Sequence, residues 1–127
     1  MITSMTQPER RQNRSENTTR ALFLQLDASL QNADLEGMIL ADEDGVCLAT
    51  AGDAPACDEI AAQLPIMGRK VNQFEGVLFG PAMRWEIQMK RLNVEGSDLY
   101  LCAVGESAAR NDQLQQSMNG VARILAA

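Results

Sequence analysis

The densest group of side chains that could do chemistry is the acidic run Asp42-Glu43-Asp44-Gly45. An Asp-x-Asp-Gly start is typical of calcium loops, because Ca²⁺ prefers carboxylate oxygens as ligands. Such a loop also needs a polar ligand at its fifth position and a Glu at its twelfth, and these positions hold Val46 and Asp53. The pattern therefore favours a solvated hairpin turn over a metal site. We predict no metal and no cofactor.

The residue types that most enzymes need are scarce. The chain contains no His, which removes the commonest general base, the usual activator of a Ser or Cys nucleophile and the commonest transition-metal ligand. The phosphate-loop pattern G-x-x-x-x-G-K-S/T is absent, and Gly76 and Gly80 flank a predicted strand rather than a helix start. We therefore predict a non-enzyme with no catalytic residues, and we expect the chain to bind no nucleotide itself.

The cysteines are odd in number: Cys47, Cys57 and Cys102. Two of them lie in apolar runs, where a thiol behaves as a small hydrophobe. Cys57 lies beside the start of a predicted helix, whose dipole can lower a thiol pKa, but no second cysteine completes C-x-x-C. A core role is favoured over redox chemistry, and a reducing cytoplasm is the expected compartment.

Length and charge bound the class of protein. The 127 residues suit one domain with its own core. The formal net charge is −6, and residues 1–20 hold four arginines against two glutamates, which leaves −8 for residues 21–127. An acidic body argues against nucleic acid and anionic membranes as partners. No leader is evident, and no apolar run approaches the roughly 20 residues of a membrane span, so we expect no membrane insertion.

The first residues differ from the rest of the chain. Residues 1–15 are polar and offer almost nothing to bury, so we predict a disordered N-terminal tail followed by a folded domain over residues 16–127. From Asn17 the spacing predicts an amphipathic helix that stops near Asn32. Its apolar stripe is Leu22, Leu26 and Leu30, widened by Phe23 and Ala28.

Two more helices follow from the same periodicity. Gly52-Asp53-Ala54-Pro55 opens the second, and Pro65 interrupts it, so we predict a kink there or two shorter segments. The last helix covers about residues 107–125. The stripe of the second helix is Cys57, Ile60, Ala61, Leu64, Met67, Gly68 and Val71; that of the last is Leu114, Met118, Val121 and Leu125.

Apolar runs predict five strands. An Asp-Gly turn joins residues 38–41 and 46–49 as a hairpin, and strands follow at 75–80, 83–94 and 99–104. In the run 83–94 the apolar residues change parity after Lys90-Arg91, which predicts a β-bulge or strong bend. Because the joining turns are too short for parallel crossovers, we expect an α+β fold with a largely antiparallel sheet and helices on its faces, in the order α-β-β-α-β-β-β-α.

The hairpin from Leu35 to Thr50 resembles the first hairpin of Roadblock (dynein light chain) domains. In both, a Gly-containing apolar strand ends in Asp, a Gly turn follows, and the second strand ends in Ala-Ser or, here, Ala49-Thr50. The resemblance extends over the element order of residues 20–125, while Pro65 and the cysteine content depart from the family pattern. It implies a five-stranded antiparallel sheet with one helix on one face and two on the other.

The same resemblance implies homodimers that pair the third strand and second helix across a two-fold axis. It also implies binding to Ras-like small GTPases or to motor and scaffold complexes. Small residues on the second helix permit close approach by another element, in this chain or in a partner. The predicted dimer or partner interface comprises Ala61, Leu64, Met67, Gly68, Arg69, Lys70, Arg84 and Trp85.

Two features of this set have alternative interpretations. Trp85 is either a partner anchor or an ordinary core residue, and the sequence leaves both open. The positive charges Arg69, Lys70, Arg84, Lys90 and Arg91 favour a solvated face that protects a sheet edge over a contact for an acidic partner. Arg69 and Arg84 are the candidates for an arginine finger, a role to which we assign neither.

The leading functional hypothesis is a homodimeric regulatory module that binds a Ras-like small GTPase and changes its nucleotide cycle or location. The alternative is a structural adaptor in a motility, polarity or signalling complex. A small-molecule sensor or enzyme that uses the sheet face as a pocket ranks third, because the chain lacks His and its strands carry few polar residues.

Overall fold

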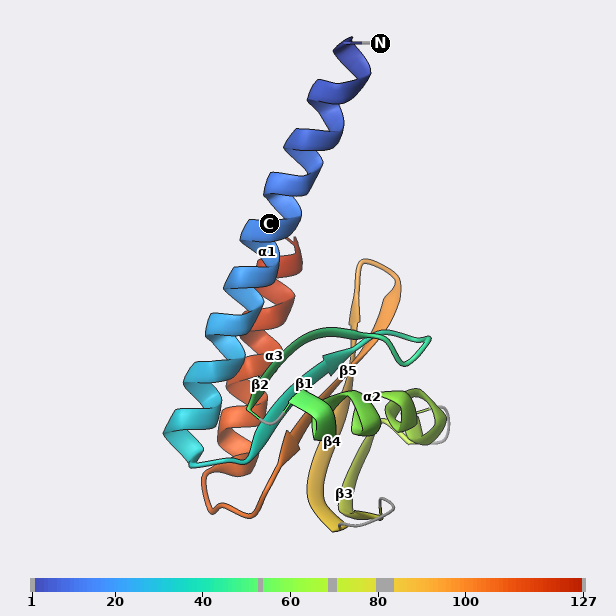
Figure 1. The fold of residues 1–127 in the computed structure, drawn as a ribbon. Helices are drawn as coiled ribbons and strands as arrows, with labels where there is room; N and C mark the ends of the chain where they lie inside the picture. Colours follow the sequence, from blue (N-terminus) through green and yellow to red (C-terminus); the bar gives the residue numbers. More distant parts are fainter. Residues whose placement is uncertain (1, 53, 69–70, 80–83, 127) are drawn as a thin grey trace.

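The structure, a computed structural model, describes residues 2–52, 54–68, 71–79 and 84–126. The predicted Gly80-Pro81 turn lies outside them. The order of helices and strands along the chain is the predicted one, and the fold is α+β (Figure 1). The elements are α1 (Ile2–Ala33), β1 (Gly37–Ala41), β2 (Cys47–Gly52), α2 (Ala54–Gly68), β3 (Gln73–Phe79), β4 (Arg84–Val94), β5 (Ser97–Val104) and α3 (Arg110–Ala126).

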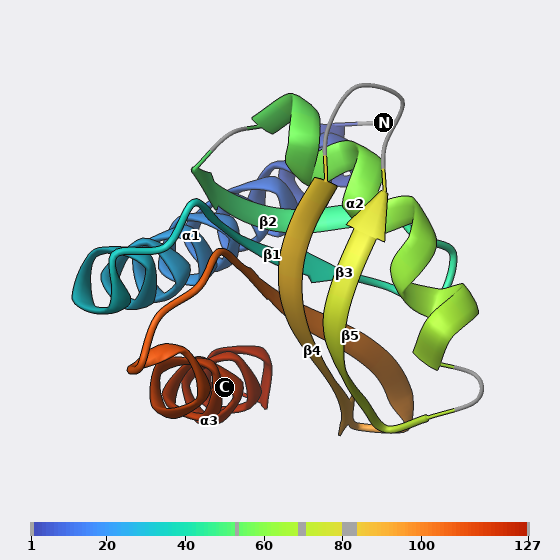
Figure 2. The same ribbon diagram turned by 90° about the horizontal axis from the view of Figure 1, so that it is seen from below.

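All strand pairs are antiparallel, and the strand order is β2-β1-β5-β4-β3. The apolar strand β5 is central, and β2 and β3 are the two edges. Helices α1 and α3 lie side by side on one face of the sheet, and α2 covers the other (Figures 1 and 2). The sheet therefore divides the core into two layers.

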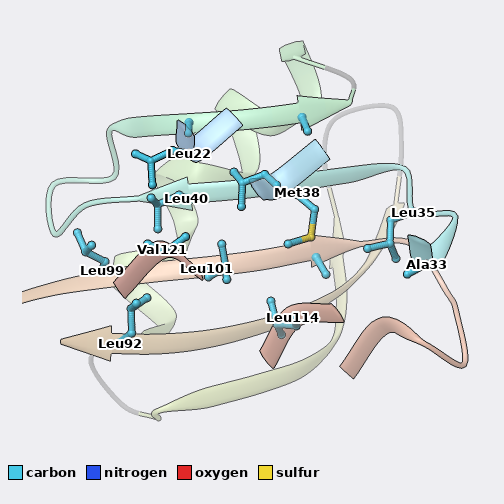
Figure 3. Close-up of a cluster of buried hydrophobic side chains, with 14 residues drawn as sticks. Leu22, Ala33, Leu35, Met38, Leu40, Leu92, Leu99, Leu101, Leu114 and Val121 are labelled. Atoms are coloured by element: carbon cyan, nitrogen blue, oxygen red, sulfur yellow. The ribbon is translucent and has the colours of Figure 1, made fainter. Parts of the chain in front are cut away.

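Each layer has its own hydrophobic cluster. Between the sheet and α1 and α3, side chains such as Leu40, Leu101 and Leu114 pack together (Figure 3). Beneath α2, the core includes Ile60 and Ile87. Strands β1 and β5 contribute to both clusters, so their apolar runs are unbroken rather than alternating.

Of the bulge or strong bend predicted at Lys90-Arg91, the bulge is wrong and the bend stays a prediction. The ladder between β4 and β5 runs without a register shift from Ile87 opposite Val104 to Val94 opposite Ser97. The parity change has another cause, because Trp85, Ile87 and Met89 belong to the layer beneath α2, whereas Leu92 packs with α1 and α3. The apolar residues of β4 therefore face α2 in its first part and face α1 and α3 at Leu92. The register shift that the structure has lies between β1 and β2, at Leu40 and Ala41.

Helix α1 differs from the prediction in length and in its buried face. It begins at Ile2 rather than near Asn17 and ends at Ala33, one residue past the predicted stop. The disorder of residues 1–15 in solution stays a prediction. Phe23 and Ala28 are exposed, while Ser29 joins the leucines on the buried face. The reason is α3, whose packing turns Ser29 inward: its hydroxyl donates to the Gln113 carbonyl oxygen at 3.2 Å.

Helix α2 is one continuous helix, so of the two alternatives predicted at Pro65 the two shorter segments are wrong, and the kink stays a prediction. Pro65 lies in its last turn, because the helix ends at Gly68. A proline there removes a single hydrogen bond close to the helix end, where little helix remains to be broken. Val71, which the apolar stripe places in this helix, lies beyond it and is exposed.

Candidate protein interface

The acidic turn between β1 and β2 serves the backbone. Asp42 Oδ1 accepts hydrogen bonds from the amides of Asp44, at 2.9 Å, and Val46, at 3.0 Å. Gly45 has a φ of 79°, and a Cβ there would lie 3.1 Å from the Cα of Ala62. Within the described residues, no group of three His, Cys, Asp or Glu side chains is placed to hold a metal ion. The geometry is that of a side-chain-stabilised turn.

Two of the three thiols, those of Cys47 and Cys102, have raised pKa values. Burial, with help from the nearby Asp58 carboxylate, raises the pKa of Cys47 to about 11. Burial also raises the pKa of Cys102, and Cys57 lies on the buried face of α2. Because the thiolate is the nucleophile, raised pKa values make Cys47 and Cys102 poorly reactive. The position of Cys57 fits the core role that its spacing favoured.

The predicted interface residues of α2 lie on the helix face that packs on this chain's own sheet. Ala61 and Leu64 are buried, Gly68 is buried against Tyr100, and Met67 is half-buried. A Cβ on Gly68 would clash with the Tyr100 ring. The small residue therefore permits close approach by β5 of the same chain, which answers a question that the sequence left open.

Trp85 is also buried within the single chain. It lies opposite Leu78 on β3 and belongs to the cluster beneath α2. This position supports the interpretation of Trp85 as a core residue. Because Phe74 and Leu78 of β3 pack in the same cluster, Trp85 helps to hold β3 to the sheet on the face that α2 covers.

Apolar side chains nevertheless remain exposed around α2 and β3. Ile66 on α2 is 65% exposed, Phe79 at the end of β3 is 76% exposed, and Val71 between them in the chain is also exposed. We call Ile66, Val71, Phe79 and the outer edge of β3 the α2–β3 surface. The sequence offered one clue to Ile66, which falls outside the apolar stripe of its helix. Phe79 shares the strand parity of the polar residues Gln73 and Glu75, and this parity was the sequence clue that its side chain is exposed.

The positive residues near this surface have separate roles. Arg84 is exposed and lies 3.9 Å from Glu86. Lys90 donates to the side chain of Gln115 on α3 at 3.4 Å. Arg91 donates to the carbonyl oxygen of Gly68 at 3.2 Å and to the side chain of Asn72, so it ties the end of α2 to the start of β3. Arg69 and Lys70 lie outside the described residues.

A buried arginine that the sequence analysis missed supports β3 from the other face. Arg110, at the start of α3, donates to the carbonyl oxygen of Gly105 at 2.7 Å and to Gln88 at 3.2 Å. Its guanidinium also lies 3.2 Å from the carboxylate of Glu75 on β3. The sequence gives no clue that Arg110 is buried. Its burial depends on Glu75, Gln88 and Gly105, which are distant from it or not adjacent to it in the chain.

Two polar hollows lie beside this network. One, of about 360 Å³, is lined by Arg84 and four carboxylates, and the other, of about 340 Å³, by Gln73, Phe74, Glu75, Gln88 and Asn111. In the first, a hydrogen bond with Glu106 is the main cause that raises the pKa of Glu86. The carboxylate lining is Asp34, Glu36, Glu86 and Glu106.

Comparison with known proteins identifies the fold. A structure described as MglB with a tetrameric arrangement superposes with a TM-score of 0.62 at 18% identity, covering 84% of this chain and 89% of that one. The gliding protein MglB of Thermus thermophilus gives 0.59 at 17%, covering 84% and 90%. A Roadblock/LC7 domain of Streptomyces avermitilis gives 0.55 at 18%, covering 81% and 93%.

No family model matches the sequence, and no curated protein matches it. The structural likeness nevertheless shows that the chain has a Roadblock-like fold. The arrangement of one helix on one face of the sheet and two on the other agrees with the expectation from the first hairpin. No helix among the described residues is long and apolar enough to cross a membrane.

Proposed function

We propose that this protein is a non-enzymatic regulatory module that forms a homodimer and binds a Ras-like small GTPase. The observation that carries the proposal is the edge of β3, which has a large exposed apolar side chain near it on each face of the sheet. Ile66 is exposed on α2, and Phe79 is exposed on the opposite face, because it shares the strand parity of Glu75, which contacts Arg110 of α3. Exposed apolar side chains beside an unpaired strand edge favour a protein partner.

The edge of β3 gives the dimer a physical basis. Within the described residues, β4 is the strand that pairs with β3, and its other side has no strand partner. A second copy that adds its own β3 across a two-fold axis would satisfy these backbone groups. Ile66 would then lie beside the junction on the α2 face of the sheet, and Phe79 on the face of α1 and α3. Arg91 and Arg110 hold α2 and β3 in the positions that this pairing needs.

The GTPase partner rests on the resemblance of the first hairpin and on the Roadblock-like fold. A chain without His, whose Cys47 and Cys102 thiols have raised pKa values, is better suited to position a partner than to do chemistry. The second candidate is an adaptor with a partner other than a GTPase. It is favoured by one observation, the likeness to a protein described as a gliding protein.

Two measurements test the proposal. Size-exclusion chromatography with light scattering at micromolar concentration should give a dimer, and a monomer would count against the α2–β3 surface. GTP hydrolysis and nucleotide release by Ras-like GTPases of the same organism should change when this protein is added. An unchanged rate with every GTPase, together with no binding, would favour the adaptor.

A further inference from the structure

The opposite edge of the sheet is formed by β2. Within the described residues, β1 is the strand that pairs with β2, and the outer side of β2 has no strand partner. Natural edge strands are usually protected by charged residues or proline, because unpaired backbone groups invite another strand. Residues 46–52 contain neither.

Exposed apolar side chains accompany this edge. Val46, directly before β2, is 55% exposed, and Leu48 is 36% exposed. The register shift at the start of β2 leaves Leu48 out of the pairs with β1. The edge therefore presents both free backbone groups and apolar contacts.

Helix α1 adds a third apolar side chain on the same side. Its other flank faces α3, since Ser29 and Asn32 reach Gln113 there. Phe23 lies seven residues before Leu30, so both fall on one line of the helix. The Leu30 side chain is 3.0 Å from the position of a Cβ at Gly52, the last residue of β2. Phe23, which is 44% exposed, therefore lies on the β2 flank of α1.

The charges around β2 are mostly negative. Asp42, Glu43 and Asp44 form the turn that leads into it. Asp58 of α2 lies close enough to affect the thiol of Cys47, the first residue of β2, so these carboxylates gather at the same end of the strand. Arg20, one turn before Phe23, adds a single positive charge.

We propose that the β2 edge binds an extended segment of a partner protein, which joins the sheet as a further strand. The segment carries apolar side chains, which contact Val46, Leu48 and Phe23, and Lys or Arg at the end that lies beside the acidic turn, which complement the carboxylates there. Backbone hydrogen bonds supply affinity, and the apolar side chains and the basic end supply specificity. Because β2 and β3 are opposite edges, this site stays open when the α2–β3 surface is occupied.

The probe for this site is a fluorescein-labelled peptide, Lys-Lys-Val-Thr-Val-Thr-Val-Lys, added to the full chain. We expect saturable anisotropy, weaker binding at high salt, and new hydrogen-exchange protection at residues 46–52 followed by NMR. Leu48→Lys should weaken binding by roughly tenfold, or about 1.4 kcal/mol. The matched control is Leu24→Lys, which makes the same change at an exposed position on α1 and should bind as the unaltered chain does.

Three results would overturn the proposal. If a peptide N-methylated at alternate residues binds equally well, the backbone is not the recognised feature. Protection that falls on residues 73–79 would place the peptide at the wrong edge. Concentration-dependent protection of residues 46–52 without peptide would assign this edge to a second copy of the chain. Leu48→Lys should still form the dimer proposed for the α2–β3 surface, so a loss of peptide binding in this variant can be told apart from a loss of dimerisation.

Discussion

The two edges of the sheet differ in what surrounds them. Beside β3 lie exposed Ile66 and Phe79, and the nearby side chains of Arg84 and Arg91 are basic. Beside β2 the exposed apolar side chains are Val46, Leu48 and Phe23, which are less exposed than Ile66 and Phe79, and carboxylates gather at the end where β2 begins. Backbone edges are chemically alike, so their neighbours decide the partner. We therefore propose a second copy of the chain as the partner of the β3 edge and a basic extended segment as the partner of the β2 edge.

The largest expected effect comes from removing the support of β3. Trp85→Ala should lower the free energy of unfolding by about 3–5 kcal/mol, because it leaves a cavity beneath α2. Urea unfolding followed by circular dichroism measures this. Thr50→Ala, on β2, serves as a control and should change stability by much less. A stability loss below about 1 kcal/mol would contradict the placement of Trp85 in the core.

The next effect tests whether the β3 edge, rather than the β2 edge, forms the dimer. Ile66→Asp and Phe79→Asp should each convert the dimer to a monomer, since a charge would be buried in the interface, while unfolding changes by only about 0.5 kcal/mol. Light scattering gives the mass, and Leu24→Asp, at an exposed site on α1, should remain dimeric. If both variants stay dimeric, β3 is not the dimer edge.

A smaller effect tests the tie between α2 and β3. Arg91→Ala removes hydrogen bonds to Gly68 and Asn72 and should cost about 1–2 kcal/mol. We expect weaker dimerisation together with faster amide exchange at the start of β3. Lys90→Ala is the matched control, because that lysine contacts α3 through one exposed hydrogen bond. Equal effects of the two variants would remove Arg91 from this role.

The smallest effect concerns the β2 edge and pH. The pKa of Cys47 is raised to about 11, so between pH 9 and 11 the unfolded chain loses this proton before the folded chain does. Stability should therefore fall slightly as the pH rises through that window, because the folded state holds more protons. At pH 8, iodoacetamide should modify Cys47 roughly tenfold more slowly than a free cysteine.

Asp58→Asn tests the cause, since it removes the carboxylate that helps to raise the pKa and should speed the modification of Cys47. Mass spectrometry of digested protein identifies the modified residue. A rate for Cys47 equal to that of free cysteine in the unaltered chain would contradict a buried, protonated thiol.

Local patterns in the sequence were enough for most of the fold. The Asp-Gly turn predicted the β1–β2 hairpin, and the apolar run at residues 99–104 predicted the central strand β5. The site was harder, because the predicted residues Ala61 and Leu64 are covered by the chain's own sheet. Periodicity identifies the face that a helix buries, and an interface on the same helix uses the other face.

The sequence by itself determined the elements, their order and the turn chemistry, because these depend on contacts between residues close along the chain. It also showed that the chain has no His to serve as a general base or metal ligand. Only the tertiary structure decided which side chains stay exposed, since α1 and α3 cover one stretch of β4 and α2 another. The same packing turned Ser29 inward, left Ile66 and Phe79 outside, and left two unlike sheet edges open.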